Sequence, residues 1–138
     1  MGKKAPWHLW AVGILSLLWY GSGAYVIVLA QRGMWPGMEP DEAAYYAAQP
    51  GWFALLTDIG LATSILGSIA LLMRKSWALS LFGVALVLIL GNDAYDLAMG
   101  TSRAYANSAA MVVTAVIAVV AVLEVVYASA MTKRGVLG

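Results

Sequence analysis

Four long, almost uncharged apolar segments constrain this chain more than any other feature. They cover about residues 7–30, 51–73, 77–98 and 105–131. A bilayer core needs about 20 apolar residues in a helix that rises 1.5 Å per residue, so each segment can cross it. Lipid offers the backbone no hydrogen-bond partner, and the segments are too uniformly apolar for barrel strands. The sequence therefore predicts an all-α protein, a bundle of four transmembrane helices.

Composition agrees with this prediction and excludes several classes of site. Hydrophobic residues make up 62% of the 138 positions, against roughly 45–50% in a soluble domain. The length suits a single transmembrane domain, residues 1–138. The chain has no cysteine and one histidine, which excludes thiolate metal sites and bis-histidine haem ligation within one chain. We therefore expect no cofactor and no metal. We also expect no nucleic-acid partner, because basic tracts are absent.

The basic residues predict the orientation. With the N-terminus in the cytoplasm, the cytoplasmic side receives Lys3, Lys4, Arg74, Lys75, Lys133 and Arg134, and the outer side receives Arg32 and Arg103. This bias follows the positive-inside rule, so we expect both termini in the cytoplasm. The first apolar run is far longer than the ~7–15 residues of a signal-peptide core, so we expect that helix to be retained.

The connections between the predicted spans differ in length. Arg74 and Lys75 form a tight cytoplasmic turn, which makes the two flanking helices antiparallel neighbours. The first outer loop is longer, and the segment 40–48 within it predicts a short interfacial helix. Proline suits the first position of a helix, acidic residues suit its first turn, and Pro50 stops it.

Two carboxylates interrupt the predicted spans. An ionised aspartate at the centre of a membrane helix costs roughly 2.5–3.5 kcal/mol, so intramembrane acids are candidates for function. Asp58 falls in the outer half of its span and Glu124 in the cytoplasmic half. They are therefore too far apart for one acid/base pair. For each we weigh a structural role against a proton or ion relay.

Glu124 shares a helical face with Ala110, Ala121 and Ala128. Small residues favour close helix packing, so this face should point into the bundle. Candidate partners at a similar depth are Trp10, Ser68 and Ser80.

Asp58 projects opposite a stripe of small residues on the same helix. The stripe, which we expect to pack against a neighbouring helix, is Gly60, Ser64, Gly67 and Ser68. The helix is then either sandwiched inside the bundle or in contact with another subunit through its Asp58 side. Candidate internal partners of Asp58 are Asn92 and Tyr25.

An acidic patch is expected on the outer side. It comprises Asp93 and Asp96, three residues apart on one helix, with Asp41 and Glu42 from the loop. Calcium takes such oxygen ligands, but the spacing matches no calcium loop, so we expect a solvated or Arg103-paired cluster. We expect His8 to be an interfacial anchor beside Trp7 and Trp10.

A resemblance extends over more than half of the chain, from Pro6 to Phe82. Its motifs are residues 6–10 (PWHLW), 16–19 (SLLW), 23–24 (GA), 50–52 (PGW), 66–68 (LGS) and 74–78 (RKSWA). They resemble a family of small four-helix proteobacterial membrane proteins, whose members are sometimes labelled sugar transporters. The resemblance implies a bacterial inner-membrane location. Tyr20 and Asp58 depart from the family pattern, so no role for them follows from it.

No nucleophile–base pair, phosphate loop or metal motif is present in the sequence, so we expect a protein that is not an enzyme. The leading hypothesis is an accessory or scaffolding subunit of a larger membrane complex, for instance a respiratory or photosynthetic one. The first alternative is a small homo-oligomeric transporter or channel that uses Asp58 or Glu124. The second is a module that binds a lipid or a pigment.

Overall fold

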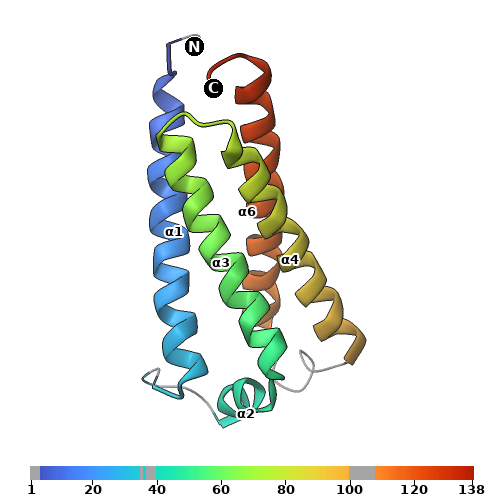
Figure 1. Ribbon diagram of the computed structural model, residues 1–138. Coiled ribbons are helices and arrows are strands. Elements are labelled where there is room, and N and C mark those ends of the chain that lie inside the picture. Colours follow the sequence, from blue (N-terminus) through green and yellow to red (C-terminus); the bar gives the residue numbers. More distant parts are fainter. Residues whose placement is uncertain (1–3, 35, 37–39, 100–107) are drawn as a thin grey trace.

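Five helices make up the computed structural model, which describes residues 4–34, 36, 40–99 and 108–138 (Figure 1). They are α1 (Trp7–Gln31), α2 (Pro40–Ala48), α3 (Gly51–Leu72), α4 (Trp77–Met99) and α6 (Ser108–Lys133). Four of these helices are long and apolar enough to cross a membrane. The prediction of an all-α, four-helix transmembrane bundle is confirmed, and the chain is a multi-pass integral membrane protein. The predicted start of the last helix, residues 105–107, lies outside the described residues.

Three of the long helices end in the same hydrogen-bonded turn, which needs a left-handed residue just after the helix. Gly33 (φ 69°) and Gly135 (φ 76°) supply it after α1 and α6, and Arg74 (φ 58°) supplies it after α3. The left-handed conformation costs a residue with a side chain about 1–2 kcal/mol. A hydrogen bond helps to hold Arg74 in this conformation, because its Nε donates to the Val136 carbonyl at 3.2 Å.

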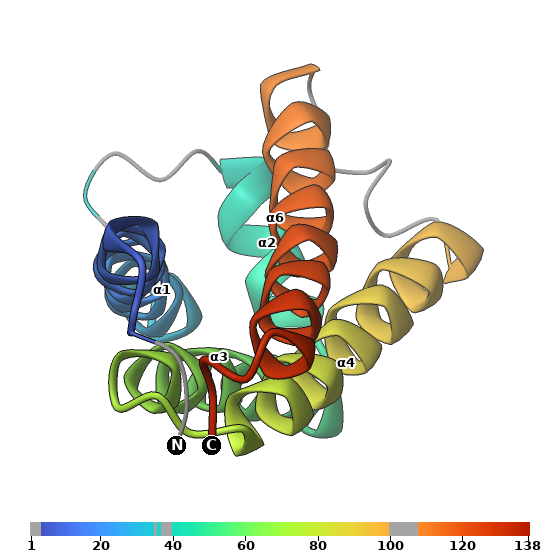
Figure 2. The same ribbon diagram turned by 90° about the horizontal axis from the view of Figure 1, so that it is seen from above.

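The long helices form an open series in which α1 packs on α3, α3 on α4, and α4 on α6. Figure 2 shows α1 and α6 lying apart, with α3 and α4 completing the series on the other side. Both termini lie at one end of the bundle, here called the terminal end, and α2 lies across the other, here called the distal end (Figure 1).

Small residues allow the close approaches of α3. Gly60, Ser64, Gly67 and Ser68 are all buried, so the packing stripe lies where the sequence predicts it. A Cβ added to Gly67 would lie 3.0 Å from the ring of Phe82 on α4. The opposite face of α3, with Leu55, Leu66 and Met73, is exposed. Helix α3 thus packs against α1 and α4, and its opposite face is left exposed.

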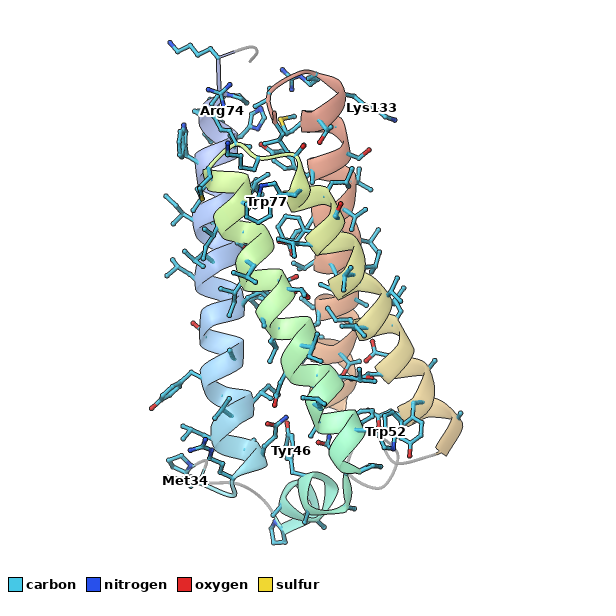
Figure 3. All side chains as sticks on the ribbon, in the orientation of Figure 1. Met34, Tyr46, Trp52, Arg74, Trp77 and Lys133 are labelled. Carbon is cyan, nitrogen blue, oxygen red and sulfur yellow. The ribbon has the colours of Figure 1, made fainter. Side chains whose placement is uncertain are left out.

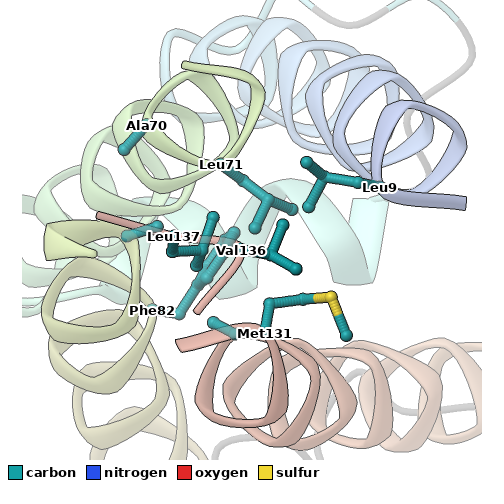
Figure 4. Packing of buried hydrophobic residues seen from close by; sticks show 9 residues of the cluster. Leu9, Ala70, Leu71, Phe82, Met131, Val136 and Leu137 are labelled. Atoms are coloured by element: carbon teal, nitrogen blue, oxygen red, sulfur yellow. The ribbon is translucent and has the colours of Figure 1, made fainter. Parts of the chain in front are cut away.

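The terminal half of the bundle holds a tightly packed apolar core. Leu9, Leu71, Phe82 and Met131 converge there from the four long helices (Figure 4). The C-terminal tail folds back into this core through Val136 and Leu137, which are both buried. The tail is also tied by its backbone to the turn between α3 and α4, since Ser76 N–H donates to the Gly138 carbonyl at 3.0 Å. The terminal end of the bundle is thus closed.

Gly13→Ala tests the contact between α1 and α3. The added Cβ would lie 2.5 and 2.7 Å from Leu72 Cδ2 and Cγ, and such overpacking costs about 1–3 kcal/mol. Gly21→Ala is the matched control on the same helix, because nothing lies within 4 Å of the added atom. We expect only Gly13→Ala to lower the free energy of unfolding, measured by circular dichroism during titration with sodium dodecyl sulfate. Equal stability of the two variants would contradict the packing.

Candidate functional site

The distal half of the bundle forms a partly open cavity of about 650 Å³, within the ~300–1,000 Å³ typical of ligand sites. Its walls come from all four long helices, and Tyr46 of α2 contributes at the distal end. Most wall residues are apolar, as Ile27, Leu88 and Ile117 illustrate. Polar side chains gather at the two ends of the cavity.

Tyr20, which is hydrogen-bonded to Glu124, forms the polar end of the cavity nearer the middle of the bundle. Tyr20 lines the cavity, and its hydroxyl donates a hydrogen bond to Glu124 Oε1. The two side chains are only 3% and 5% exposed. Ser16 adjoins the carboxylate and Ser64 adjoins the tyrosine hydroxyl. Glu124 Oε2 has no hydrogen-bond partner among the described residues.

The geometry of antiparallel helices explains how Tyr20 reaches Glu124. Side chains lean toward the N-terminus of their own helix. Tyr20 on α1 therefore leans toward the terminal end, and Glu124 on α6 leans toward the distal end. Because the two side chains lean toward each other along the bundle axis, they can meet even where their backbones lie at different depths.

His8 and Tyr127 link the same two helices at the terminal end. His8 Nδ1 and the Tyr127 hydroxyl share a hydrogen bond, and the two rings meet edge to face with centroids 5.6 Å apart. The two pairs are spaced differently along their helices. From His8 to Tyr20 the rise along α1 is roughly 18 Å, whereas from Tyr127 to Glu124 the rise along α6 is only about 4.5 Å. His8 thus has a hydrogen-bond partner on α6. The sequence analysis expected only an interfacial anchor and did not predict this partner.

The distal mouth of the cavity carries amides and carboxylates. Asn92 Nδ2 donates to Thr57 Oγ1 at 2.9 Å and so joins α4 to α3. Asp93 and Asp96 both line the cavity, as does Gln31, whose buried Nε2 has no partner among the described residues. The other members of the predicted acidic patch, Asp41 and Glu42, have side chains outside the described part of the chain, and Arg103 also lies outside it.

The partners expected for Glu124 were wrong. Trp10 and Ser80 are exposed, and Ser68 donates instead to the Ser64 carbonyl at 2.9 Å. The expectation placed partners by backbone depth and ignored the lean of the side chains, which brings Tyr20 into reach.

The partners expected for Asp58 were also wrong. Asn92 pairs with Thr57, and Tyr25 is 67% exposed. Asp58 is partly buried on the flank of α3 and does not line the cavity. Its Oδ1 is buried without a hydrogen-bond partner among the described residues. Asp58 and Glu124 therefore belong to separate environments, as their predicted depths require.

Comparisons with known proteins give no further guide to the site. No family model matches the chain, no curated protein matches it significantly, and no solved structure does so either. The resemblance to small proteobacterial membrane proteins therefore stays a prediction. Within the described residues, no group of three or more His, Cys, Asp or Glu side chains is placed to hold a metal ion. The arrangement offers hydrogen bonds and negative charge at the ends of an apolar chamber.

Tyr20→Phe tests the hydrogen bond that spans the bundle. It leaves the buried Glu124 Oε1 without its donor, so we expect the free energy of unfolding to fall by about 1–2 kcal/mol. Tyr25→Phe is the control, since this tyrosine is on the same helix and exposed. A double-mutant cycle with Glu124→Gln should show coupling between Tyr20 and Glu124. Additive effects of the two substitutions would argue against the bond.

Proposed function

We propose that this protein is a non-catalytic membrane protein that binds a lipophilic molecule inside its helix bundle. The observation that carries the proposal is the distal cavity, with apolar walls and polar groups at both ends. Ligand sites of this kind combine a mostly apolar lining with a few polar groups that fix orientation. The proposal corresponds to the lipid- or pigment-binding alternative from the sequence.

Access from the membrane supports binding of a lipophilic molecule. Trp19 on α1 and Val113 on α6 both line the cavity, yet they are 41% and 53% exposed. Helices α1 and α6 are also not among the extensively packed helix pairs of the described residues. A molecule dissolved in the bilayer can therefore reach the cavity sideways, past these exposed lining residues of α1 and α6.

The closed terminal end favours binding over passage. Tyr20 bounds the cavity and is hydrogen-bonded to Glu124, and the core around Leu9, Leu71 and Phe82 fills the bundle beyond this pair. A transporter or channel that uses Glu124 would have to open this packed half. The transport alternative therefore has less support than the binding proposal.

The second candidate function is the accessory subunit of a larger membrane complex. It is favoured by Asp58 Oδ1, a buried acceptor without a donor in the described part of the chain. A polar group of this kind is costly in lipid, and a neighbouring subunit could supply the missing donor. The exposed face of α3 with Leu55 and Leu66 would adjoin such a contact.

We further propose a bacterial inner membrane and cytoplasmic termini. Arg74 and Lys133 lie at the terminal end, with Met34, Tyr46 and Trp52 at the opposite end (Figure 3). Lys4, Lys75 and Arg134 belong to the same end, because they adjoin the termini and the turn between α3 and α4. This distribution supports the terminal end as the cytoplasmic one.

Ile117→Trp tests the binding proposal by filling the chamber. Ile117 lines the cavity, whereas its neighbour Val116 is exposed and does not. We expect native mass spectrometry of the gently extracted protein to detect a bound lipophilic molecule. Ile117→Trp should reduce its occupancy about tenfold or more, and Val116→Trp should leave it unchanged.

The same measurement decides between the candidates. Equal occupancy in both variants, or no bound molecule in the parent protein, contradicts the binding proposal. Stoichiometric association with other membrane subunits that Asp58→Asn weakens would support the accessory-subunit function instead. Migration as the free chain alone contradicts that second candidate.

Reporter fusions test the orientation. With the C-terminus in the cytoplasm, a C-terminal green fluorescent protein should fluoresce in a bacterial host, and a C-terminal alkaline phosphatase should be inactive. The reverse pattern would overturn the argument from basic residues.

A further inference from the structure

One buried donor in the cavity wall has no hydrogen-bond partner among the described residues. Gln31 lines the cavity at the distal mouth, and its buried Nε2 is this unpaired donor. Burying a polar group without a partner is costly, and a ligand oxygen that accepts from it removes the cost. The last torsion of a glutamine side chain is soft, so the amide can turn Nε2 toward a molecule in the cavity. Gln31 therefore favours a ligand that carries a hydrogen-bond acceptor.

Two other polar groups of the wall already donate to partners within the bundle. At the mouth, Asn92 Nδ2 donates to Thr57 Oγ1 at 2.9 Å. At the inner end, the Tyr20 hydroxyl has a single hydrogen, which it donates to Glu124 Oε1. An acceptor on the ligand is therefore matched by Gln31 at the distal mouth and not by Tyr20 at the inner end.

The length of the cavity matches one leaflet of a bilayer. Gln31 is the last residue of α1, and the rise along the helix from Tyr20 to Gln31 is roughly 16 Å. The hydrocarbon core of a bilayer is about 30 Å thick, so one leaflet contributes about 15 Å. Between these two positions the wall is mostly apolar, as Ile27, Leu88 and Ile117 illustrate. An acyl chain that runs from the membrane interface to the middle of the bilayer has this length and this polarity.

We infer that the ligand is an acyl lipid, which binds through the carbonyl oxygen of an ester. This ligand class rests on the proposed binding function. The ester carbonyl accepts from Gln31 Nε2 at the distal mouth, and the acyl chain lies along the apolar walls with its end near Tyr20. The chain enters sideways past Trp19 and Val113, because both residues line the cavity and are exposed. The head of the lipid stays at the membrane surface.

Competition between an ester lipid and its ether analogue tests the role of the carbonyl. Delipidated full-length protein in dodecyl maltoside receives equal amounts of dimyristoyl phosphatidylcholine and ditetradecyl phosphatidylcholine, which has the same head and chain length but no carbonyl. Native mass spectrometry resolves the two bound lipids. We expect the ester lipid to bind about fivefold more tightly, the ratio that one hydrogen bond supplies. Gln31→Met should remove this preference. Gln49→Met should retain it, because Gln49 also lines the cavity but is not a buried, unpaired donor.

Unfolding of the lipid-free protein tests whether the Gln31 amide is unpaired. Methionine has a similar shape and no donor, so Gln31→Met removes an unsatisfied group from the bundle. We therefore expect the free energy of unfolding to equal or exceed that of the parent protein, measured by circular dichroism during titration with sodium dodecyl sulfate. A loss of stability would show that the amide is bonded within the chain, and it would overturn the proposed contact with the ligand.

The ligand class and the proposed function can fail separately. Equal affinity for the ester and ether lipids, or a preference that survives Gln31→Met, overturns the acyl-ester class. If Ile117→Trp still weakens binding of both lipids, the binding function stands without that class. If neither lipid binds the parent protein, both proposals fail. Size-exclusion profiles like that of the parent protein establish that each variant is folded.

Discussion

The hydrogen bond between Tyr20 and Glu124 crosses the bundle where α1 and α6 are not an extensively packed pair. At the terminal end, His8 and Tyr127 join the same helices, and the tail residues Val136 and Leu137 add apolar contacts. On the distal side of Tyr20, α1 and α6 form walls of the cavity. The bond therefore marks the boundary between a packed half of the bundle and a hollow half. Because lipid offers neither group an alternative partner, both side chains are held at that boundary.

The hollow half follows from unequal contacts around the helix series. Gly13 faces Leu72, and Gly67 faces Phe82, so α3 closes tightly on α1 and on α4. Among the described residues, no comparable close approach joins α1 to α6. These two helices are linked instead by two polar pairs with long side chains. Long side chains hold helices together at a larger separation than glycines do. The series therefore stays open on one side, and α2 with Tyr46 covers part of the distal end.

The sequence predicts the features that depend on local pattern. The spans follow from apolar length, α2 from Pro40 and Pro50, and the buried stripe of α3 from the spacing of Gly60, Ser64 and Gly67. The cavity and the Tyr20–Glu124 pair depend instead on how far two helices separate and how they tilt. No local pattern encodes that separation. The signal that was available for Tyr20 is its phenolic hydroxyl inside an apolar span, where a buried donor needs an acceptor.

Selectivity in such a chamber has to come from its polar ends. Lipid chains are as apolar as the side chains of Leu88 or Ile117, so apolar walls alone do not favour a ligand over the lipid it displaces. Selectivity is a difference between two binding affinities. Here that difference depends on the polar groups of the cavity, because lipid chains cannot form hydrogen bonds with them. At the mouth these are the side chains of Asp93 and Gln31, and at the inner end that of Tyr20, which is hydrogen-bonded to Glu124. Under the proposed binding function, the apolar walls set the shape of the ligand and the polar groups at the two ends set its orientation.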